Sequence, residues 1–427
     1  MNQLLTKQIH SVLLVAAMLL ETASCSKTEE MNLPVSEPET QVQRLIVAPT
    51  RDYEEALAIA QQSIALVDRP ATRAQRPRTI RSSRGQCVTV PATRNGESQT
   101  DTLMYVFNFE DDNGFAIIAA NRAVDPILAV TEKGSYTYGE KTGVENFDFY
   151  MDVLTSGLGG VVRPPIIEIP DTLPRFKTIE YDEEGHCEPL VPVNWGQSGI
   201  FGAYADNRKA GCVAVAMAQI MASHRFPTTI TTTYPDNGYT QHAGEIIELD
   251  WDNLIAYPYT NDYKISALLR EIGEQVNMDY ISDPNNSGAK RAAAVNGFKA
   301  FGYHFVTDLY SYSDAAIRRE LDSNQPVYVR GTDPQEGGHA WVADGYSYEK
   351  KGYEYYEYQT IVDEFGNKRR EYVLVNSTVT TQNLIHYNWG WSGIANGYFA
   401  GINHCAVSAF DFQELQMITS IKRATNL

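Results

Sequence analysis

The chain has 427 residues, of which 43% are hydrophobic and 21% are charged, and its formal net charge is −18. This is the composition of a folded globular protein with room for two domains, and it excludes collagen-like, wholly disordered and multi-spanning membrane proteins. Nucleic-acid binders neutralise phosphates with a basic face. The acidic charge therefore argues against a nucleic-acid partner.

Residues 1–25 have the pattern of an export signal. A nine-residue run without polar side chains, Val12 to Leu20, follows a short polar start and is too short to cross a bilayer as a helix. The segment after it, Thr22-Ala23-Ser24-Cys25, resembles the lipobox of bacterial lipoproteins. This resemblance implies a lipid on Cys25, as the only link to a membrane, and a place at the outer membrane or cell surface. An ordinary secretory signal cleaved near Ala23-Ser24 is the alternative.

The region after the signal is expected to form a small α+β domain, residues 26–160. Apolar residues recur at spacings of four and three from Tyr53 to Val67, which is typical of an amphipathic helix. Residues 104–109 and 114–119 are strand-like runs separated by an acidic turn, which predicts a hairpin.

Two segments of this half predict irregular structure. Residues 69–94 hold seven arginines and no acid, which favours an exposed flexible loop over a basic binding patch. Residues 161–193 are rich in proline and acids and are expected to be an extended linker that contains the processing site. Residues 194–427 then make one enzyme-sized domain.

The first motif with chemical meaning is a cysteine at the start of a helix. Residues 210–221 predict a buried helix that begins at Gly211-Cys212 and ends before Pro227. A thiol in the first turn of a helix feels the positive end of the helix dipole, which favours the nucleophilic thiolate. A single cysteine on an alanine-rich helix is more often a small core residue, so the interpretation depends on two further motifs.

The other motifs carry a histidine and an asparagine. His339 follows two glycines, which allow close approach of a substrate, at the head of an apolar strand. Asn388 ends a later strand and is followed by tryptophans and glycines that can orient and shield an imidazole. Cysteine, then histidine about 130 residues later, then asparagine is the order expected of a papain-like cysteine peptidase.

The three motifs together resemble the streptopain family of secreted bacterial cysteine peptidases. They are Gly-Cys-Val-Ala on a helix that ends in His-x-Phe-Pro, then Gly-Gly-His-Ala, then Asn-Trp-Gly-Trp-x-Gly. The helix and hairpin of the N-terminal half are similar to that family's inhibitory propeptide. The resemblance covers roughly residues 45–427. It implies an α+β fold: a papain-like domain, with the cysteine in a helical part and the histidine and asparagine on a twisted antiparallel sheet, preceded by an α+β propeptide.

The resemblance also implies a role for each motif residue. Cys212 is the nucleophile, and His339 is the general base that later protonates the leaving amine. Gln197 is the matching side-chain donor to the oxyanion, beside the Cys212 backbone N–H. Asn388 would hold the His339 ring, and Trp389 would cover that hydrogen bond from water. The candidate substrate-binding residues are Gly337, Gly338 and Trp391.

Some features lie outside the family pattern or argue against other chemistry. Residues 348–383 predict an inserted hairpin that either contacts substrate or is a surface ribbon. Strand geometry argues against Asp344 as a third catalytic acid. The other histidines show no metal-ligand spacing, so neither a metal nor another cofactor is expected.

We expect an exported cysteine endopeptidase made as a zymogen. Its substrates would be polypeptides, its propeptide would be an intramolecular inhibitor, and hydrolysis would pass through a Cys212 thioester. A Cys-His amidase or transpeptidase on cell-wall peptides is an alternative, because the same nucleophile and base serve any acyl transfer. A catalytically silent surface binding protein on the same fold is another.

Overall fold

A computed structural model describes most of the chain after residue 49. The described ranges are 50–68, 78–81, 85–94, 97–160, 176–205, 209–234, 243–280, 288–333, 337–362, 368–401 and 415–423. The predicted signal and Cys25 lie outside them. No helix within these ranges is long and apolar enough to cross a membrane.

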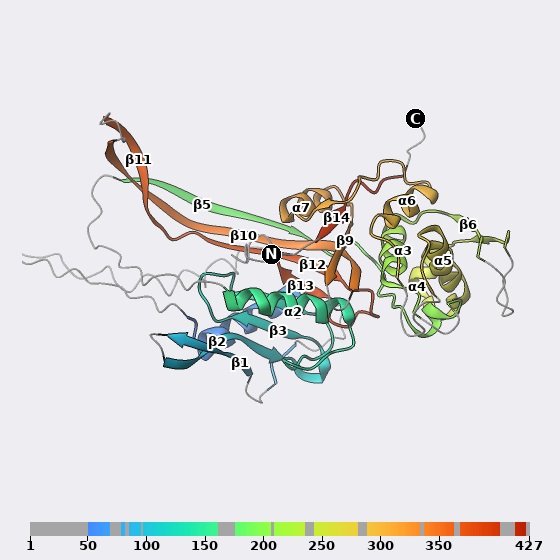
Figure 1. The fold of residues 1–427 in the computed structure, drawn as a ribbon, viewed down its shortest axis with the longest axis horizontal. Helices are drawn as coiled ribbons and strands as arrows, with labels where there is room; N and C mark the ends of the chain where they lie inside the picture. Colours follow the sequence, from blue (N-terminus) through green and yellow to red (C-terminus); the bar gives the residue numbers. More distant parts are fainter. Residues whose placement is uncertain are drawn as a thin grey trace, which may run out of the picture. The chain divides into compact units, whose positions relative to one another are not determined.

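The N-terminal domain is a four-stranded antiparallel sheet with two helices (Figure 1). Its elements are α1 (Tyr53–Ser63), β1 (Gln86–Arg94), β2 (Glu97–Asn108), β3 (Phe115–Ala119), β4 (Ile127–Thr131) and α2 (Glu145–Gly160). The predicted helix and hairpin are confirmed. Asp52 caps α1 by accepting the N–H of Glu55 at 2.9 Å, which satisfies one of the free donors of the first turn.

The prediction of a flexible loop over residues 69–94 is wrong in its last third. Residues 86–94 form strand β1, which pairs with β2 from Gln86 opposite Val106 to Arg94 opposite Glu97. The prediction was based on the arginines and overlooked a run of β-branched residues in this segment, which favours a strand. Arg78 is also held by the domain, since its guanidinium donates to Asp68 at 2.5 Å and to the Val67 carbonyl at 2.6 Å.

The C-terminal domain has a helical part and a sheet part. The helical part contains α3 (Cys212–His224), α4 (Trp251–Ala256), α5 (Asp262–Gln275), α6 (Ala293–Ala300) and the short strands β6 (Thr229–Thr231) and β7 (Ile246–Glu248). The sheet part contains β8 (Tyr310–Ser311), α7 (Asp314–Asp322), β9 (Val327–Asp333), β10 (Gly337–Val362), β12 (Thr380–Asn388), β13 (Gly397–Ala400) and β14 (Gln416–Ile418). The helix predicted to begin at Cys212 and to end before Pro227 is confirmed.

The sheets of the two domains join into one. Strand β4 pairs antiparallel with β13, with Ala129 opposite Phe399 and Thr131 opposite Gly397. The strand order is therefore β1-β2-β3-β4-β13-β12-β10-β9-β14-β8. Backbone hydrogen bonds, and not only side-chain contacts, hold the N-terminal domain on the C-terminal domain.

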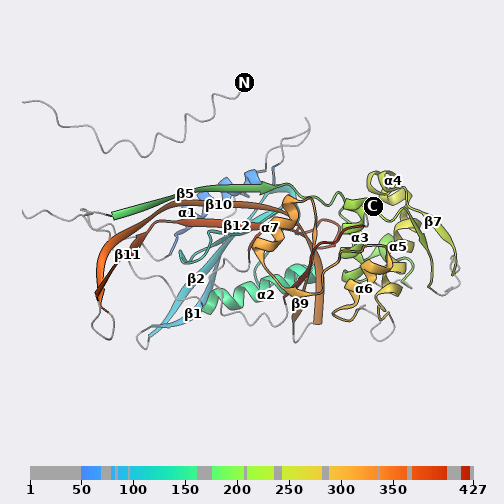
Figure 2. The ribbon, with the colours of Figure 1, turned by 90° about the horizontal axis from the view of Figure 1, so that it is seen from above.

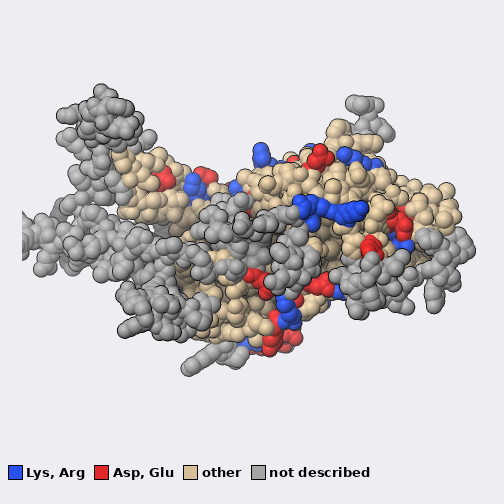
Figure 3. Space-filling model, in the orientation of Figure 1, with Lys and Arg blue, Asp and Glu red and all other residues tan. Residues whose placement is uncertain are grey.

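Strand β10 extends into an arm that contains the predicted insertion (Figure 2). Beyond β12 it pairs with β11 (Lys368–Ser377), so the expected hairpin is confirmed. On its other edge it pairs with β5 (Phe176–Cys187), a segment of the expected linker. Tyrosine–carboxylate pairs stabilise this third strand: Tyr181 donates to Glu354 at 2.9 Å. On the face drawn in Figure 3, acidic and basic side chains alternate in small groups among the described residues.

The two faces of β10 near its start look onto different cores. Trp341 and Ala343 pack in the core of the N-terminal domain and the sheet, whereas Ala340 and Val342 pack in the core that contains α3. This alternation follows from the two-residue period of a strand. It decides which catalytic candidates share a face.

Candidate active site

Cys212 begins α3 beside the first residues of β10. Gly211, at φ 98°, adopts a left-handed conformation that turns the chain into the helix. The backbone N–H groups of Ala340 and Val213 lie beside the thiol and act to lower its pKa. Burial nevertheless raises the pKa of Cys212, and the nearby carboxylate of Glu145 raises it further. The expected thiolate is therefore disfavoured while the N-terminal domain covers the site, because burial outweighs the helix N-terminus.

His339 lies one residue from the backbone group that contacts the thiol. Its side chain is 7% exposed, and the centroid of its ring is 5.6 Å from that of Phe149 in α2. Phe149 also contacts Trp341, at 6.3 Å between centroids, so both side chains of β10 face the N-terminal domain. The imidazole is thus packed against α2 while the thiol lies beside Ala340.

The first turn of α2 occupies the space between the ends of β10 and β12. Asn146 is fully buried and donates through Nδ2 to the carbonyls of Ala340 at 2.7 Å and Trp389 at 2.9 Å. Glu145, the residue before it, pairs with Lys209, three residues before Cys212. The sequence interpretation missed these two residues. The available signal was a polar Asn146 amid the aromatic residues of a predictable helix.

Gln197 is a buried amide on a loop next to α3. Its side chain is 3% exposed, and its carbonyl accepts the N–H of Ala210 at 2.9 Å, two residues before Cys212. The Nε2 group has no hydrogen-bond acceptor among the residues that the structure describes. A buried donor without an acceptor is rare in a folded protein and points to a group that the site receives later.

Asn388 makes its contacts on the α3 side of the sheet. Its Nδ2 donates to the Val193 carbonyl at 3.0 Å, and its Oδ1 accepts from Gln219 Nε2 at 2.9 Å. It pairs with Val342, whose side chain faces the same core as α3. Asn388 and His339 therefore lie on opposite faces of the sheet in this structure.

The remaining candidates surround the same region. Trp389 is fully buried, donates from Nε1 to the Ala395 carbonyl at 2.9 Å and has its ring 5.3 Å from Trp341. The Lys209 ammonium lies 5.1 Å from the centre of the half-buried Trp391 ring. Gly337 and Gly338 begin β10, where a Cβ on Gly338 would lie 3.2 Å from the Arg330 guanidinium.

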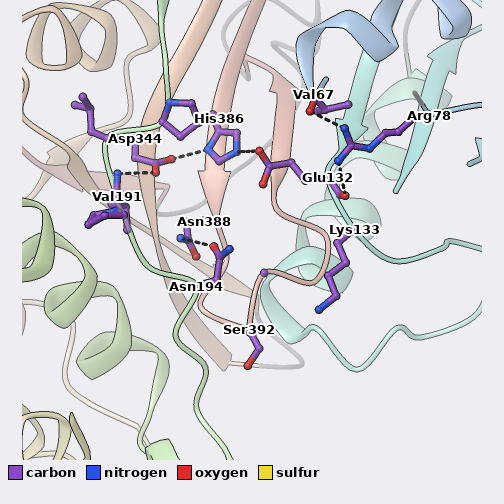
Figure 4. A pocket seen from close by; sticks show the side chains of 14 residues that line it. Val67, Arg78, Glu132, Lys133, Val191, Asn194, Asp344, His386, Asn388 and Ser392 are labelled. Carbon is purple, nitrogen blue, oxygen red and sulfur yellow. Dashed lines mark hydrogen bonds and ion pairs between the residues drawn. The ribbon is translucent and has the colours of Figure 1, made fainter. Parts of the chain in front are cut away.

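A cavity of about 600 Å³ lies between the domains and is lined by Asp344 and His386 and, on the side of the candidate site, by Asn194 and Asn388 (Figure 4). His386 Nδ1 is 2.6 Å from Asp344, and Nε2 is 3.7 Å from Glu132 of the N-terminal domain. Burial lowers the pKa of His386, but the two carboxylates outweigh it and raise the pKa to about 9. Asp344 therefore serves His386 and not His339, as strand geometry had indicated.

The thiolate of the cysteine is thus disfavoured, and the histidine is packed against a covering domain. This is the state expected of a papain-like cysteine peptidase before activation. Comparison with known proteins gives the family. The model of the Peptidase C10 family matches residues 195–399, and that of the Spi protease inhibitor matches residues 35–156. The chain belongs to the streptopain family and carries that family's inhibitory propeptide.

Individual relatives agree with this assignment. Streptopain of Streptococcus pyogenes is 26% identical over 341 residues, which cover 71% of this chain and 75% of streptopain. The thiol protease/hemagglutinin PrtT of Porphyromonas gingivalis is 21% identical over 343 residues, 70% of this chain and 34% of PrtT. The structure of a prointerpain A fragment of Prevotella intermedia has a TM-score of 0.52 at 20% identity and covers 80% of this chain and 100% of the fragment.

The predicted family, α+β fold and enzyme class are thus confirmed. The protein is a cysteine endopeptidase made as a zymogen, with polypeptide substrates and its own propeptide as intramolecular inhibitor. This assignment favours endopeptidase activity over the amidase and the silent binding protein.

Proposed function

We propose that Cys212 is the nucleophile of this endopeptidase and that His339 is its general base and acid. The observation that carries the proposal is the position of Cys212 at the start of α3, beside the first residues of β10, where the Ala340 backbone N–H, next to His339, acts to lower the pKa of the thiol. The thiolate attacks the peptide carbonyl, and His339 protonates the leaving amine. His339 then takes a proton from the water that hydrolyses the Cys212 thioester.

Gln197 and the Cys212 backbone N–H are the proposed donors to the oxyanion that forms in both steps. The buried Nε2 of Gln197 without an acceptor among the described residues supports this role. Removing one such donor lowers kcat by about 10²–10³ in other acyl-transfer enzymes. Trp389 is proposed to shield the site from water, and Gly337, Gly338 and Trp391 are proposed to contact substrate.

Activation is proposed to release α2 from the active site. Release withdraws Asn146 and Phe149, which frees the imidazole to reach the thiol, and withdraws the Glu145 carboxylate that raises the pKa of Cys212. We place the activating cut between α2 and β5, within residues 161–175 of the processing region 161–193. Strand β5 pairs with β10 along its whole length and is expected to stay with the catalytic residues 194–427.

Intact-mass analysis over time tests this function on the chain without residues 1–25, under reducing conditions. The wild-type protein should trim itself to a stable C-terminal fragment that begins within residues 161–175. Cys212→Ala should stay full length, and Cys187→Ala, a matched half-buried cysteine, should trim normally. A thiol-directed epoxide should label Cys212 only after trimming. The proposal of self-processing is contradicted if the wild-type protein and Cys212→Ala both stay full length.

Export is proposed from residues 1–25, with a lipid on Cys25 that anchors the protein at the outer membrane or cell surface. The lipobox-like Thr22-Ala23-Ser24-Cys25 supports the anchor. The mass of the mature N-terminal peptide tests it: a diacylated Cys25 is expected. An unmodified peptide that begins near Ser24 or Cys25 would instead indicate an ordinary secretory signal and release from the cell.

A further inference from the structure

We propose that Gln219 and Asn388 form a buried amide pair that positions the oxyanion loop, defined here as residues 193–197. In this assignment Asn388 serves the loop and not the His339 ring. The inference rests on the proposed role of Gln197 as oxyanion donor. Both members of the pair are positioning residues, because they act on the reaction through Gln197.

Gln219 connects the nucleophile's helix to the loop. It lies seven residues after Cys212 in α3, which is about two helical turns and places both on one side of the helix. Its side chain is fully buried. Its Nε2 donates to the Trp195 carbonyl at 3.3 Å and to Asn388 Oδ1 at 2.9 Å. One amide thus fixes the loop and the end of β12 relative to the helix that carries Cys212.

Asn388 holds the loop at a second point. Its Nδ2 donates to the Val193 carbonyl at 3.0 Å. The Gln197 carbonyl is held at a third point, by the Ala210 N–H at 2.9 Å. Carbonyls at alternate positions, 193, 195 and 197, are therefore fixed to Asn388, Gln219 and the residues before Cys212. This leaves little freedom for the Gln197 side chain to move relative to the thiol.

The loop is also packed closely on the turn after β12. A Cβ on Gly196 would lie 2.5 Å from Ser392 Oγ, and the Ser392 N–H donates to the Trp195 carbonyl at 3.4 Å. Asn194 Oδ1 accepts from Asn396 Nδ2 at 3.0 Å. The amide pair thus belongs to a wider set of contacts that join β12 to the oxyanion loop.

In the zymogen, the faces of the sheet separate Asn388 from His339. His339 packs on Phe149 together with Trp341, whereas Asn388 is bonded to Gln219 on the α3 side. To hold the imidazole, Asn388 would have to give up its bonds to Gln219 and Val193. Gln219 Nε2 would then keep only its longer bond to the Trp195 carbonyl, and Gln219 Oε1 already has no partner among the described residues. Such losses are costly in a buried site.

The test compares self-processed wild-type enzyme with four variants activated by a trace of wild type and then purified. Gln219→Met and Asn388→Ala remove the pair, Gln197→Ala removes the proposed donor, and Ser223→Ala is a matched change on α3. Two assays are used: steady-state kinetics on a peptide amide, which give kcat and KM, and the pH dependence of Cys212 alkylation by iodoacetamide. Alkylation needs no oxyanion donor but reports the ionisation of the thiol and its imidazole partner.

Gln219→Met and Asn388→Ala should each lower kcat about tenfold to a hundredfold with KM little changed, because a misplaced catalytic group slows the chemical step. The double variant should have a kcat no lower than that of the more impaired single variant, since both residues act on one loop. All four variants should keep the wild-type pH profile of alkylation. If Gln219→Met does not fold, Asn388→Ala carries the test, because it removes the same bond from the other side and should show the same loss of kcat.

Two results overturn the proposal, and they differ. An Asn388→Ala enzyme with a shifted alkylation profile, beside a Gln219→Met enzyme with normal kcat, would mean that Asn388 holds His339. In that case a Gln197→Ala enzyme with a lowered kcat would still support Gln197 as the oxyanion donor. A Gln197→Ala enzyme with normal kcat would instead remove the proposed role of Gln197, and the positioning proposal with it.

Discussion

Asn146 joins the propeptide to both strands that carry catalytic candidates. Its amide donates to the carbonyls at the ends of both strands that carry catalytic candidates. Each donated bond is worth about 0.5–1.5 kcal/mol, and loss of the donor leaves two buried carbonyls less satisfied. The stability of the closed state therefore depends strongly on this one side chain.

Replacement of Asn146 by alanine should shorten the self-processing half-life of the zymogen about tenfold, as expected for a loss of about 1–3 kcal/mol from two hydrogen bonds. The measurement is the disappearance of full-length mass at fixed concentration and pH. Lys141→Ala is the control, because its ion pair with Asp152 is exposed on both sides. An unchanged half-life would mean that Asn146 does not hold the zymogen closed.

The candidate residues of the motifs could be predicted from the sequence, but the residues to which they are hydrogen-bonded could not. Cys212 and His339 follow from local patterns: a helix start and a glycine-led strand. The bond between Asn388 and Gln219 joins positions 169 residues apart, and neither position has a local signal for the other. Strand alternation could have helped, because the bulky Tyr387 and Trp389 flank Asn388 and point to the opposite core.

At the scale of elements, the loop between β3 and β4 brings a titratable group to the N-terminal end of α7. Burial raises the pKa of Asp125 to about 7, the Asn383 N–H opposes the shift, and Asp314 adds to it. The folded state therefore favours the protonated acid. The stabilisation that comes from the protonated Asp125 is fully present below the ordinary pKa of 3.8 and is lost as the pH rises to about 7.

The Cys212→Ala zymogen, which cannot process itself, should accordingly lose thermal stability between pH 5 and pH 8. Asp125→Asn in the same background should have a flatter profile and a higher unfolding midpoint at pH 8, because it removes the buried charge. Thermal unfolding followed by circular dichroism at each pH measures both. Glu140→Gln, an exposed acid of the same domain, is the control. Parallel profiles for Asp125→Asn and its parent would refute this assignment.

Elements with a local period were predictable, and those defined by long-range pairing were not. The helix of Cys212 and both hairpins follow from spacing over a dozen residues. Strand β5 was expected to be a linker, because it contains several acids, prolines flank it in sequence, and its partner β10 lies about 170 residues away. Strand β1 was hidden by the arginines around it.

At the scale of the whole molecule, the two domains were expected from composition, but their union was not. The pairing of β4 with β13 joins residues more than 260 positions apart, and a strand sequence does not specify which edge it will meet. The His386 contact with Glu132 crosses the same boundary. The sequence therefore predicted what each domain is, and the structure adds how the propeptide is attached.

The shared sheet has a consequence for the enzyme after activation. When the propeptide leaves, β13 loses β4, and the backbone groups of Gly397–Ala400 on that side face water. Open strand edges are templates for aggregation, and proteins commonly limit this hazard by keeping them short. At four residues, β13 meets that condition. The brevity of this strand thus favours a mature protease that stays dispersed once the domain that capped its sheet has gone.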